Sequence, residues 1–319
     1  MKTKLQILLG LSLGILSMWW ATKNTDWSEV WLFLKDVRPT DMFIVAVLFM
    51  IQQFLRAHRQ VLLLPAISYK NSLLVLCIGF FFINTLPARL GELTRPILLK
   101  EREGLPLSSG LAMVFTERLL DLMSAFILAL LFLSFANIPQ LDETWSVRIA
   151  QSAQLILPLT LCVLIICFCY GQRLSRLLPQ RFSNALTPFF ETLKRQRSQL
   201  PIIICSTVII WGMTPLLFLF GASSFGIALN YIDGIGILGF TMIGMAAPNA
   251  PGFAGTYEAS FMAGLHILGF TQESRNFAFA FGFHWWVYFT QSLSALYFLA
   301  TERISFSQTL RQMRVNSKA

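Results

Sequence analysis

Six ionisable residues lie in two short stretches, ARLGELTRP and FTERLLDLM: Arg89, Glu92, Arg95, Glu117, Arg118 and Asp121. In each stretch, residues three or four positions apart share roughly one face of a helix. A guanidinium group matches the geometry of a phosphate well. The chemistry indicated is therefore binding of an anionic group by Arg89 and Arg95. The carboxylates would orient these arginines or accept a cationic group.

The same residues also fit a purely structural role. Three arginines and three acids form a neutral set, which could pin one segment to a neighbouring helix without binding anything. The two roles are compatible, because a guanidinium has five donors and one carboxylate uses only two of them. A helix that begins after Pro87 would also turn free backbone N–H groups toward an anion.

A second stretch, AAPNAPGFAGTYE, interrupts the apolar sequence near residue 250. Proline removes a backbone donor and disrupts the helix before it, so a helix should break here. We expect Pro251, Gly252 and Gly255 to supply flexible backbone for gating. Glu258 would bind substrate, gate or carry a proton. Close glycine packing, with Glu258 bonded to a neighbouring helix, is the alternative.

The two breaks resemble each other. The first reads N-x-x-P-x-x-x-G-E from Asn84, with Pro87 and Gly91 as its structural residues, and the second reads N-x-P-x-x-x-G-x-x-E from Asn249. Each break follows one long apolar segment and precedes another. Interrupted segments in corresponding positions of two halves point to a transporter's binding site. The pattern leaves open whether the two units form a strict inverted repeat.

Other kinds of site find little support. No Ser/His/Asp arrangement, metal-ligand set or P-loop can be assembled, and the five cysteines lie in apolar runs without a CxxC pair. GIGILG at 234–239 matches a dinucleotide fingerprint but lacks the strand–turn–helix context that the motif needs. We therefore expect no catalytic residue, no cofactor and no metal. An enzyme would have to rely on carboxylates alone, so a non-enzymatic function is favoured.

Membrane helices must position these residues. Of the 319 residues, 55% are hydrophobic and 13% are charged, whereas a soluble domain carries about 25% charged residues. Several apolar blocks reach or approach the ~20 residues that span a bilayer. The sequence predicts one all-α, polytopic membrane domain over 1–319, with about six to eight transmembrane segments. Basic residues lie between the apolar blocks, so the net charge of +9 does not predict a nucleic-acid partner.

Lysine and arginine in the connections predict the orientation. The basic loop 172–199 and both ends of the chain should be cytoplasmic. This holds only if 72–105 enters the membrane, turns near Pro87 and returns as a re-entrant hairpin, whose polar limb faces protein or a cavity. For 232–270, a second hairpin and a fully crossing broken pair both stay open. We expect the protein in the cytoplasmic (inner) membrane of a bacterium.

Three ordered motifs carry a resemblance to a known family. PARLGELTRPILL, then S-x-x-x-A-x-x-x-x-ERLLDL from Ser108, then PNAPGFAGTYE resemble the lysylphosphatidylglycerol synthase transmembrane region. The resemblance implies a flippase-like helical domain; in multidomain members it flips an aminoacylated phospholipid made by a soluble synthase domain. It also implies roles for the residues of the three motifs and, more weakly, for Arg56 and Arg59. With no synthase domain before the end at Ala319, we do not expect lysine transfer.

The resulting hypothesis is a lipid translocase for an anionic or modified phospholipid or a lipid-linked headgroup. Its partners would be membrane lipids, and the scaffold alternative adds a lipid-modifying enzyme recruited through loop 172–199. The alternatives are an integral membrane enzyme, or a scaffold component, of lipid or lipid-linked sugar modification. The lipid, the direction and energy source of movement, and the oligomeric state do not follow from the sequence.

Overall fold

The fold of this chain is helical throughout its regular structure. The computed structural model describes residues 2–85, 91–135, 139, 143–175, 180, 191, 194–246 and 250–302. Over these residues there are helices and no strands, which confirms the predicted all-α class. The helices are α1 (Lys2–Thr22), α2 (Trp27–Lys35), α3 (Pro39–Leu63), α4 (Tyr69–Thr85), α5 (Thr94–Glu103), α6 (Leu107–Phe135), α7 (Glu143–Ser175), η2 (Arg197–Gln199), α9 (Leu200–Ser224), α10 (Tyr231–Ala246), η3 (Pro251–Phe253), α11 (Thr256–Ile267) and α12 (Glu273–Thr301).

The long helices have the character of membrane spans. By length and composition, α3, α6 and the stretch Arg197–Ser224, which contains α9, can each cross a membrane, and shorter apolar helices accompany them. Large apolar side chains such as Leu155, Val208 and Leu122 are 76%, 64% and 63% exposed. Such extensive apolar exposure indicates contact with lipid rather than water. The chain is therefore a polytopic helical membrane protein.

Helices α4 and α5 form an antiparallel hairpin. At its open end, Glu103 accepts hydrogen bonds from Ser68 and Asn71 at 2.9–3.0 Å. Near the tip, the limbs approach so closely that a Cβ on Gly91 would lie 2.2 Å from the backbone nitrogen of Ile83. The chain thus returns to the end at which α4 begins, the course that the sequence predicts for 72–105. The depth of this hairpin in a bilayer stays a prediction.

We expect Gly91→Ala to destabilise the protein by about 1–3 kcal/mol, because the added methyl group would overlap backbone atoms of α4 that cannot rotate away. Gly239→Ala, in α10, is the matched control, since a Cβ there meets nothing within 4 Å. This control should be neutral or gain up to about 1 kcal/mol of helix propensity. Thermal unfolding of both variants in detergent measures the difference. Equal midpoints for the two variants would contradict the close approach.

Helices α10 and α11 form a second antiparallel hairpin. Gly244 of α10 lies against Ser260 of α11, and toward the other end Gly264 lies against Phe240. Helix α11 has 12 residues, which span about 18 Å. The hydrocarbon core of a bilayer is about 30 Å thick. Helix α11 alone is thus shorter than the bilayer core, and both courses left open for 232–270 stay predictions.

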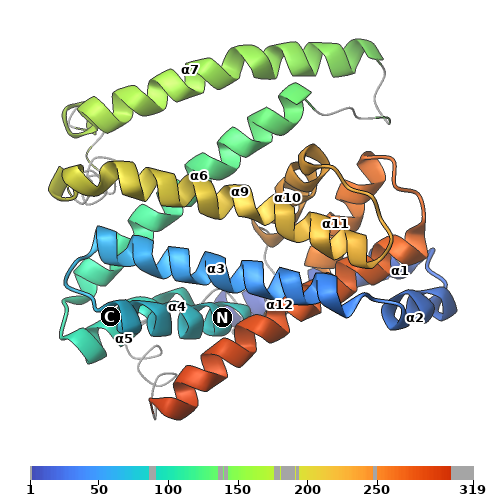
Figure 1. The fold of residues 1–319 in the computed structure, drawn as a ribbon, viewed down its shortest axis with the longest axis horizontal. Coiled ribbons are helices and arrows are strands. Elements are labelled where there is room, and N and C mark those ends of the chain that lie inside the picture. Colours follow the sequence, from blue (N-terminus) through green and yellow to red (C-terminus); the bar gives the residue numbers. More distant parts are fainter. Residues whose placement is uncertain are drawn as a thin grey trace.

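The two hairpins belong to two units of matching architecture, α3–α6 and α9–α12. Within each unit a long helix precedes the hairpin and another follows it. The packing between units is also matched. The first limb of each hairpin packs on the last helix of the other unit, α4 on α12 and α10 on α6. The last helix of each unit also contacts the first helix of the other, α6 with α9 and α12 with α3. In Figure 1, α4 and α5 lie toward the left and α10 and α11 toward the right.

The first helices of the two units, α3 and α9, lie side by side across the middle of the molecule (Figure 1). They run antiparallel. Ser224 Oγ of α9 donates to the Arg38 carbonyl at the start of α3 (3.1 Å), while Arg59, near the end of α3, donates to Thr207 near the start of α9 (3.1 Å). Antiparallel equivalent helices are the arrangement of an inverted-topology repeat. The structure thus supports the repeat that the two similar breaks suggest.

The tip of one hairpin meets the break of the other. A Cβ on Gly252 of η3 would lie 3.8 Å from the carbonyl oxygen of Asn84 at the end of α4. The open end of the first hairpin is instead fixed to the end of α12. There Glu302 pairs with Lys70 and Arg102, each at 2.6 Å. Hydrogen bonds from these two side chains hold the pKa of the Glu302 carboxyl below its usual value.

Candidate functional site

An alternating series of charges joins α3, α5 and α6. Arg95 of α5 donates to Glu117 of α6. Arg59 of α3 lies 3.8 Å from Glu117 and 2.9 Å from Asp121, measured from its Nη2. Arg56, one turn earlier, lies 3.7 Å from Asp121. Two carboxylates are therefore shared by three guanidinium groups, and the series carries an excess of positive charge.

The middle of this series is sealed from solvent. The side chains of Arg59 and Arg95 are 1% and 2% exposed, and that of Glu117 is 4% exposed. Helix α9 completes the site: the Trp211 indole N–H donates to Asp121 at 3.0 Å. Buried charges of this kind persist only when they are paired and hydrogen-bonded. These contacts fix the relative positions of three helices and one limb of the first hairpin.

Arg56 and Arg59 are thus central to the network, although the sequence analysis gives them only as weaker candidates. The neutral set expected from ARLGELTRP and FTERLLDLM does not include these two additional cations. The sequence feature that could have indicated their role is the position of both arginines, one turn apart, inside the apolar segment of α3. Their partners lie about 60 residues downstream, and no local spacing reveals such a contact.

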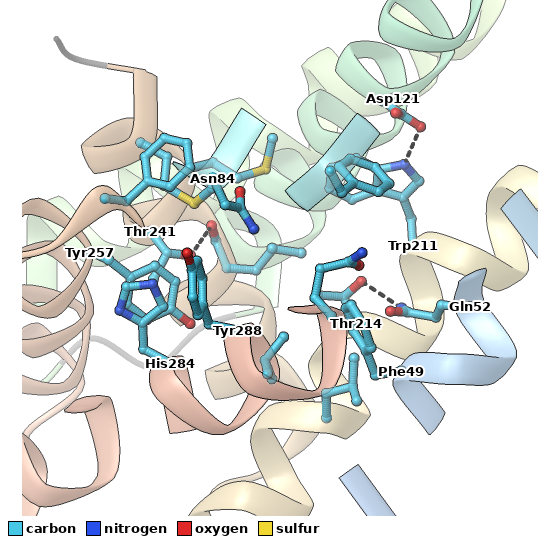
Figure 2. A pocket seen from close by; sticks show the side chains of 18 of the residues that line it. Phe49, Gln52, Asn84, Asp121, Trp211, Thr214, Thr241, Tyr257, His284 and Tyr288 are labelled. Atoms are coloured by element: carbon cyan, nitrogen blue, oxygen red, sulfur yellow. Dashed lines mark hydrogen bonds between the residues drawn. The ribbon is translucent and has the colours of Figure 1, made fainter. Parts of the chain in front are cut away.

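A cavity of about 580 Å³ opens beside this network, with lining residues from both units. This volume is within the range of small-molecule sites, about 300–1,000 Å³. Its polar lining includes Gln52, Asn84, Asp121, Thr214, Thr241 and Tyr288, which Figure 2 shows around a common space. Leu122 of α6 and Ala246 of α10 also line it and are exposed. The cavity therefore extends toward the outer apolar surface between these two helices.

Among the described residues, two guanidinium groups contact the cavity, those of Arg56 and Arg118. The side chain of Arg56 is 18% exposed. Arg118 is half-buried, and its Nε has no hydrogen-bond partner among the described residues. Asp121 is the one carboxylate in the described lining, and Arg59 and Trp211 already occupy it. The cavity thus presents spare cationic donors and suits an anion.

The other predicted binding residues lie elsewhere. Arg95 and Glu117 do not line the cavity, and their mutual pairing favours the structural role that the sequence left open. Glu92 is half-buried in the turn before α5. Pro87 and Arg89 lie outside the described residues, so their predicted roles stay predictions.

Glu258, in the second break, is fully buried and pairs with a residue of α12. One of its carboxylate oxygens lies 2.7 Å from His284 Nδ1, and the other accepts a hydrogen bond from the Gly255 backbone N–H at 2.7 Å. Tyr257 stacks on the His284 ring, with centroids 4.1 Å apart. Tyr257 and His284 line the cavity, whereas Glu258 lies behind them. Glu258 is thus bonded to a neighbouring helix, as the alternative reading has it.

The backbone of the second break is unusual. Gly255 has a φ of +87°, and its Cα approaches α1 so closely that a Cβ would lie 1.9 Å from the Gly14 carbonyl oxygen. Phe253 has a φ of +57°, a value that residues with side chains rarely adopt. Its ring lines the cavity. Strained residues cluster at functional sites, where the surrounding structure holds them in place.

Comparison with known proteins places the chain in a family. The family model described as the lysylphosphatidylglycerol synthase TM region matches residues 7–295, nearly the whole chain. The chain belongs to this family. The resemblance of the three sequence motifs to this family is therefore confirmed. No solved structure matches the chain.

The chain is also similar to the glycosyltransferase AglD of Haloferax volcanii. The two sequences are 30% identical over 125 residues, which make up 38% of this chain and 20% of AglD. The match thus spans about a fifth of the length of that protein.

Proposed function

We propose that this chain is a lipid translocase that moves a phosphate-bearing headgroup between the leaflets of a membrane. The observation that carries the proposal is the cavity at which the two units meet, with Arg56 and Arg118 directed to it. The headgroup phosphate would accept hydrogen bonds from these guanidinium groups, as arginine geometry favours. The acyl tails would stay in the bilayer and pass the exposed gap beside Leu122 and Ala246.

The architecture supports movement through this site. Transporters built from inverted repeats bind substrate at the repeat interface, near interrupted helices, and alternate access by rocking one repeat against the other. Here the two interrupted segments meet beside the cavity. The lipid in the family description, lysylphosphatidylglycerol, contains a phosphodiester, which is the group that these arginines would bind. We place the protein in the cytoplasmic membrane with both termini on the cytoplasmic side.

The test is lipid movement in proteoliposomes that contain the full chain and acyl-labelled phosphatidylglycerol, with the outer leaflet quenched by dithionite. We expect Arg56→Gln and Arg118→Gln each to slow movement about tenfold to hundredfold, since a hydrogen bond to a charged group contributes about 1.5–3 kcal/mol. Lys100→Gln is the matched control, because this exposed lysine on α5 lies outside the cavity. Normal movement by the double Arg56→Gln/Arg118→Gln variant would contradict the proposal.

The match to AglD favours a second candidate, a membrane domain that acts in the transfer of a lipid-linked sugar. The two functions differ in their product. A translocase changes the leaflet of a lipid and leaves its mass unchanged, whereas a transferase changes the mass. Mass spectrometry of the lipids recovered from the same proteoliposomes separates the two.

A further inference from the structure

Gln53 has a polar atom that indicates the chemical class of the headgroup. This residue of α3 lines the cavity and is 3% exposed. Its side-chain Nε2 donates to Gln291 Oε1 at 2.5 Å, and Gln291 Nε2 donates to the Cys77 carbonyl at 2.9 Å. Because a carbonyl can only accept, this chain of bonds fixes the orientation of both amides.

The side-chain oxygen of Gln53 is therefore an acceptor without a hydrogen-bond donor. With both amides oriented, the remaining polar atom of Gln53 is its carbonyl oxygen Oε1, and this atom is buried with no hydrogen-bond partner among the described residues. Leaving such an atom unpaired costs about 1–3 kcal/mol, so native structures rarely do so. Other atoms of Gln53 line the cavity, so a small shift of its side chain on binding would bring this oxygen to a hydrogen-bond donor of the bound molecule.

Lipid headgroups donate hydrogen bonds chiefly through ammonium and hydroxyl groups, and the charges of the cavity lining favour one of these two. In the described lining, two guanidinium groups oppose one carboxylate, and Asp121 already accepts hydrogen bonds from Arg59 and Trp211. An ammonium group would lose its water and meet a positive surface with no unengaged carboxylate, which is costly. A hydroxyl group carries no such cost.

The rest of the polar lining agrees with a hydroxylated group. Asn84, Tyr257 and Tyr288 contribute uncharged amide and phenol groups, which both donate and accept, as hydroxyl groups do. Apolar and aromatic side chains supply most of the remaining wall, as is usual in small-molecule sites. Recognition would thus divide between two regions: arginines for the phosphate and neutral polar groups for its substituent.

We infer that the headgroup is a phosphodiester whose substituent is an uncharged hydroxylated group, such as glycerol, another polyol or a sugar. Gln53 Oε1 accepts a hydrogen bond from one of its hydroxyl groups. This inference rests on the proposed function and adds the substrate class to it. The chemistry is shared by glycerophospholipids with polyol headgroups and by polyprenyl phosphate sugars.

The experiment compares three acyl-labelled lipids in proteoliposomes of the full chain. Phosphatidylglycerol carries hydroxyl groups, phosphatidylethanol has the same charge without them, and phosphatidylethanolamine carries an ammonium group. We expect phosphatidylglycerol to move about fivefold to tenfold faster than phosphatidylethanol, the effect of roughly one hydrogen bond. Phosphatidylethanolamine should be the slowest. Competition by unlabelled polyprenyl phosphate hexose, against unlabelled phosphatidylglycerol, tells which source binds better.

Two substitutions of one residue sharpen the result. Gln53→Leu should abolish the difference between phosphatidylglycerol and phosphatidylethanol, because it removes the acceptor. Gln53→Glu should raise the movement of phosphatidylethanolamine relative to phosphatidylglycerol, because it supplies a carboxylate for the ammonium group. Gln151→Glu, on the exposed face of α7, is the control for an added acid and should change neither ratio.

A failure of the headgroup inference can be distinguished from a failure of the proposed function. If the protein moves all three lipids at equal rates, or prefers phosphatidylethanolamine, the headgroup inference is wrong and the translocase proposal stands. Preferences that survive Gln53→Leu would overturn the role of Gln53. If no lipid moves, the proposed function itself is overturned, and the inference falls with it.

Discussion

Arg59→Leu is expected to cost about 3–5 kcal/mol of folding free energy, the usual penalty for breaking a buried ion pair from one side. The substitution would leave Asp121 and Glu117 buried with one fewer cation, and Thr207 would lose its donor. Because α3, α6 and α9 meet at this residue, the loss should affect the whole bundle. The measurements are the yield of monodisperse protein in detergent and its thermal unfolding midpoint.

The neighbouring arginine provides the comparison. Arg56 lies on the same helix and contacts the same carboxylate, but at 3.7 Å and with a more exposed side chain. Arg56→Leu should therefore cost much less stability while still impairing lipid movement. The reverse order of stabilities would show that the buried network does not support the fold as described. Arg59→Lys should recover part of the loss, because it keeps the charge without the fork of donors.

Glu258→Leu is expected to have an effect of similar size, about 3–5 kcal/mol. The substitution removes the acceptor for the Gly255 backbone N–H at the start of α11 and the partner of His284 on α12, and all three residues are buried. Glu258→Gln keeps the shape and the hydrogen-bond acceptor without the charge. It should retain most of the stability in the same unfolding measurement.

A double-mutant cycle isolates the pair. His284→Leu alone leaves the Glu258 carboxylate buried without its partner, whereas His284→Leu in the Glu258→Gln background leaves no buried charge. The histidine substitution should therefore cost less in the second background, and the difference is the coupling energy between the two side chains. Equal costs in both backgrounds would show that the two residues do not act as a pair.

The two buried pairs occupy related places in the two units. Arg95–Glu117 links the return limb of the first hairpin to α6, and Glu258–His284 links the return limb of the second to α12. In the first pair the hairpin supplies the base, and in the second it supplies the acid. The two units therefore differ in which element supplies each charge, although their packing is matched.

Much of the fold could be predicted from the sequence, because apolar run length and proline position are local signals. The apolar blocks and both breaks correspond to helices and their interruptions in the structure. Helix α2 lies outside the long apolar blocks, and its nine residues give too short a signal to predict.

The site was less predictable because its contacts are distant in sequence. Arg59 meets Asp121 across 62 positions, and Gln53 meets Gln291 across 238. Charge within ARLGELTRP was visible and drew attention to Arg95, but spacing alone could not show that Glu117 occupies that arginine. Neutral amides such as Gln53 carry no sequence signal comparable to a charge in an apolar run, so their contribution to the cavity emerged only from the structure.

The packing of each hairpin against the opposite unit links the two halves of the molecule. Each hairpin rests on the last long helix of the opposite unit, α4 on α12 and α10 on α6. Each half therefore buries part of its apolar surface against the other half. A displacement of one hairpin would therefore be transmitted to the last helix of the other half, which couples the movements of the two halves.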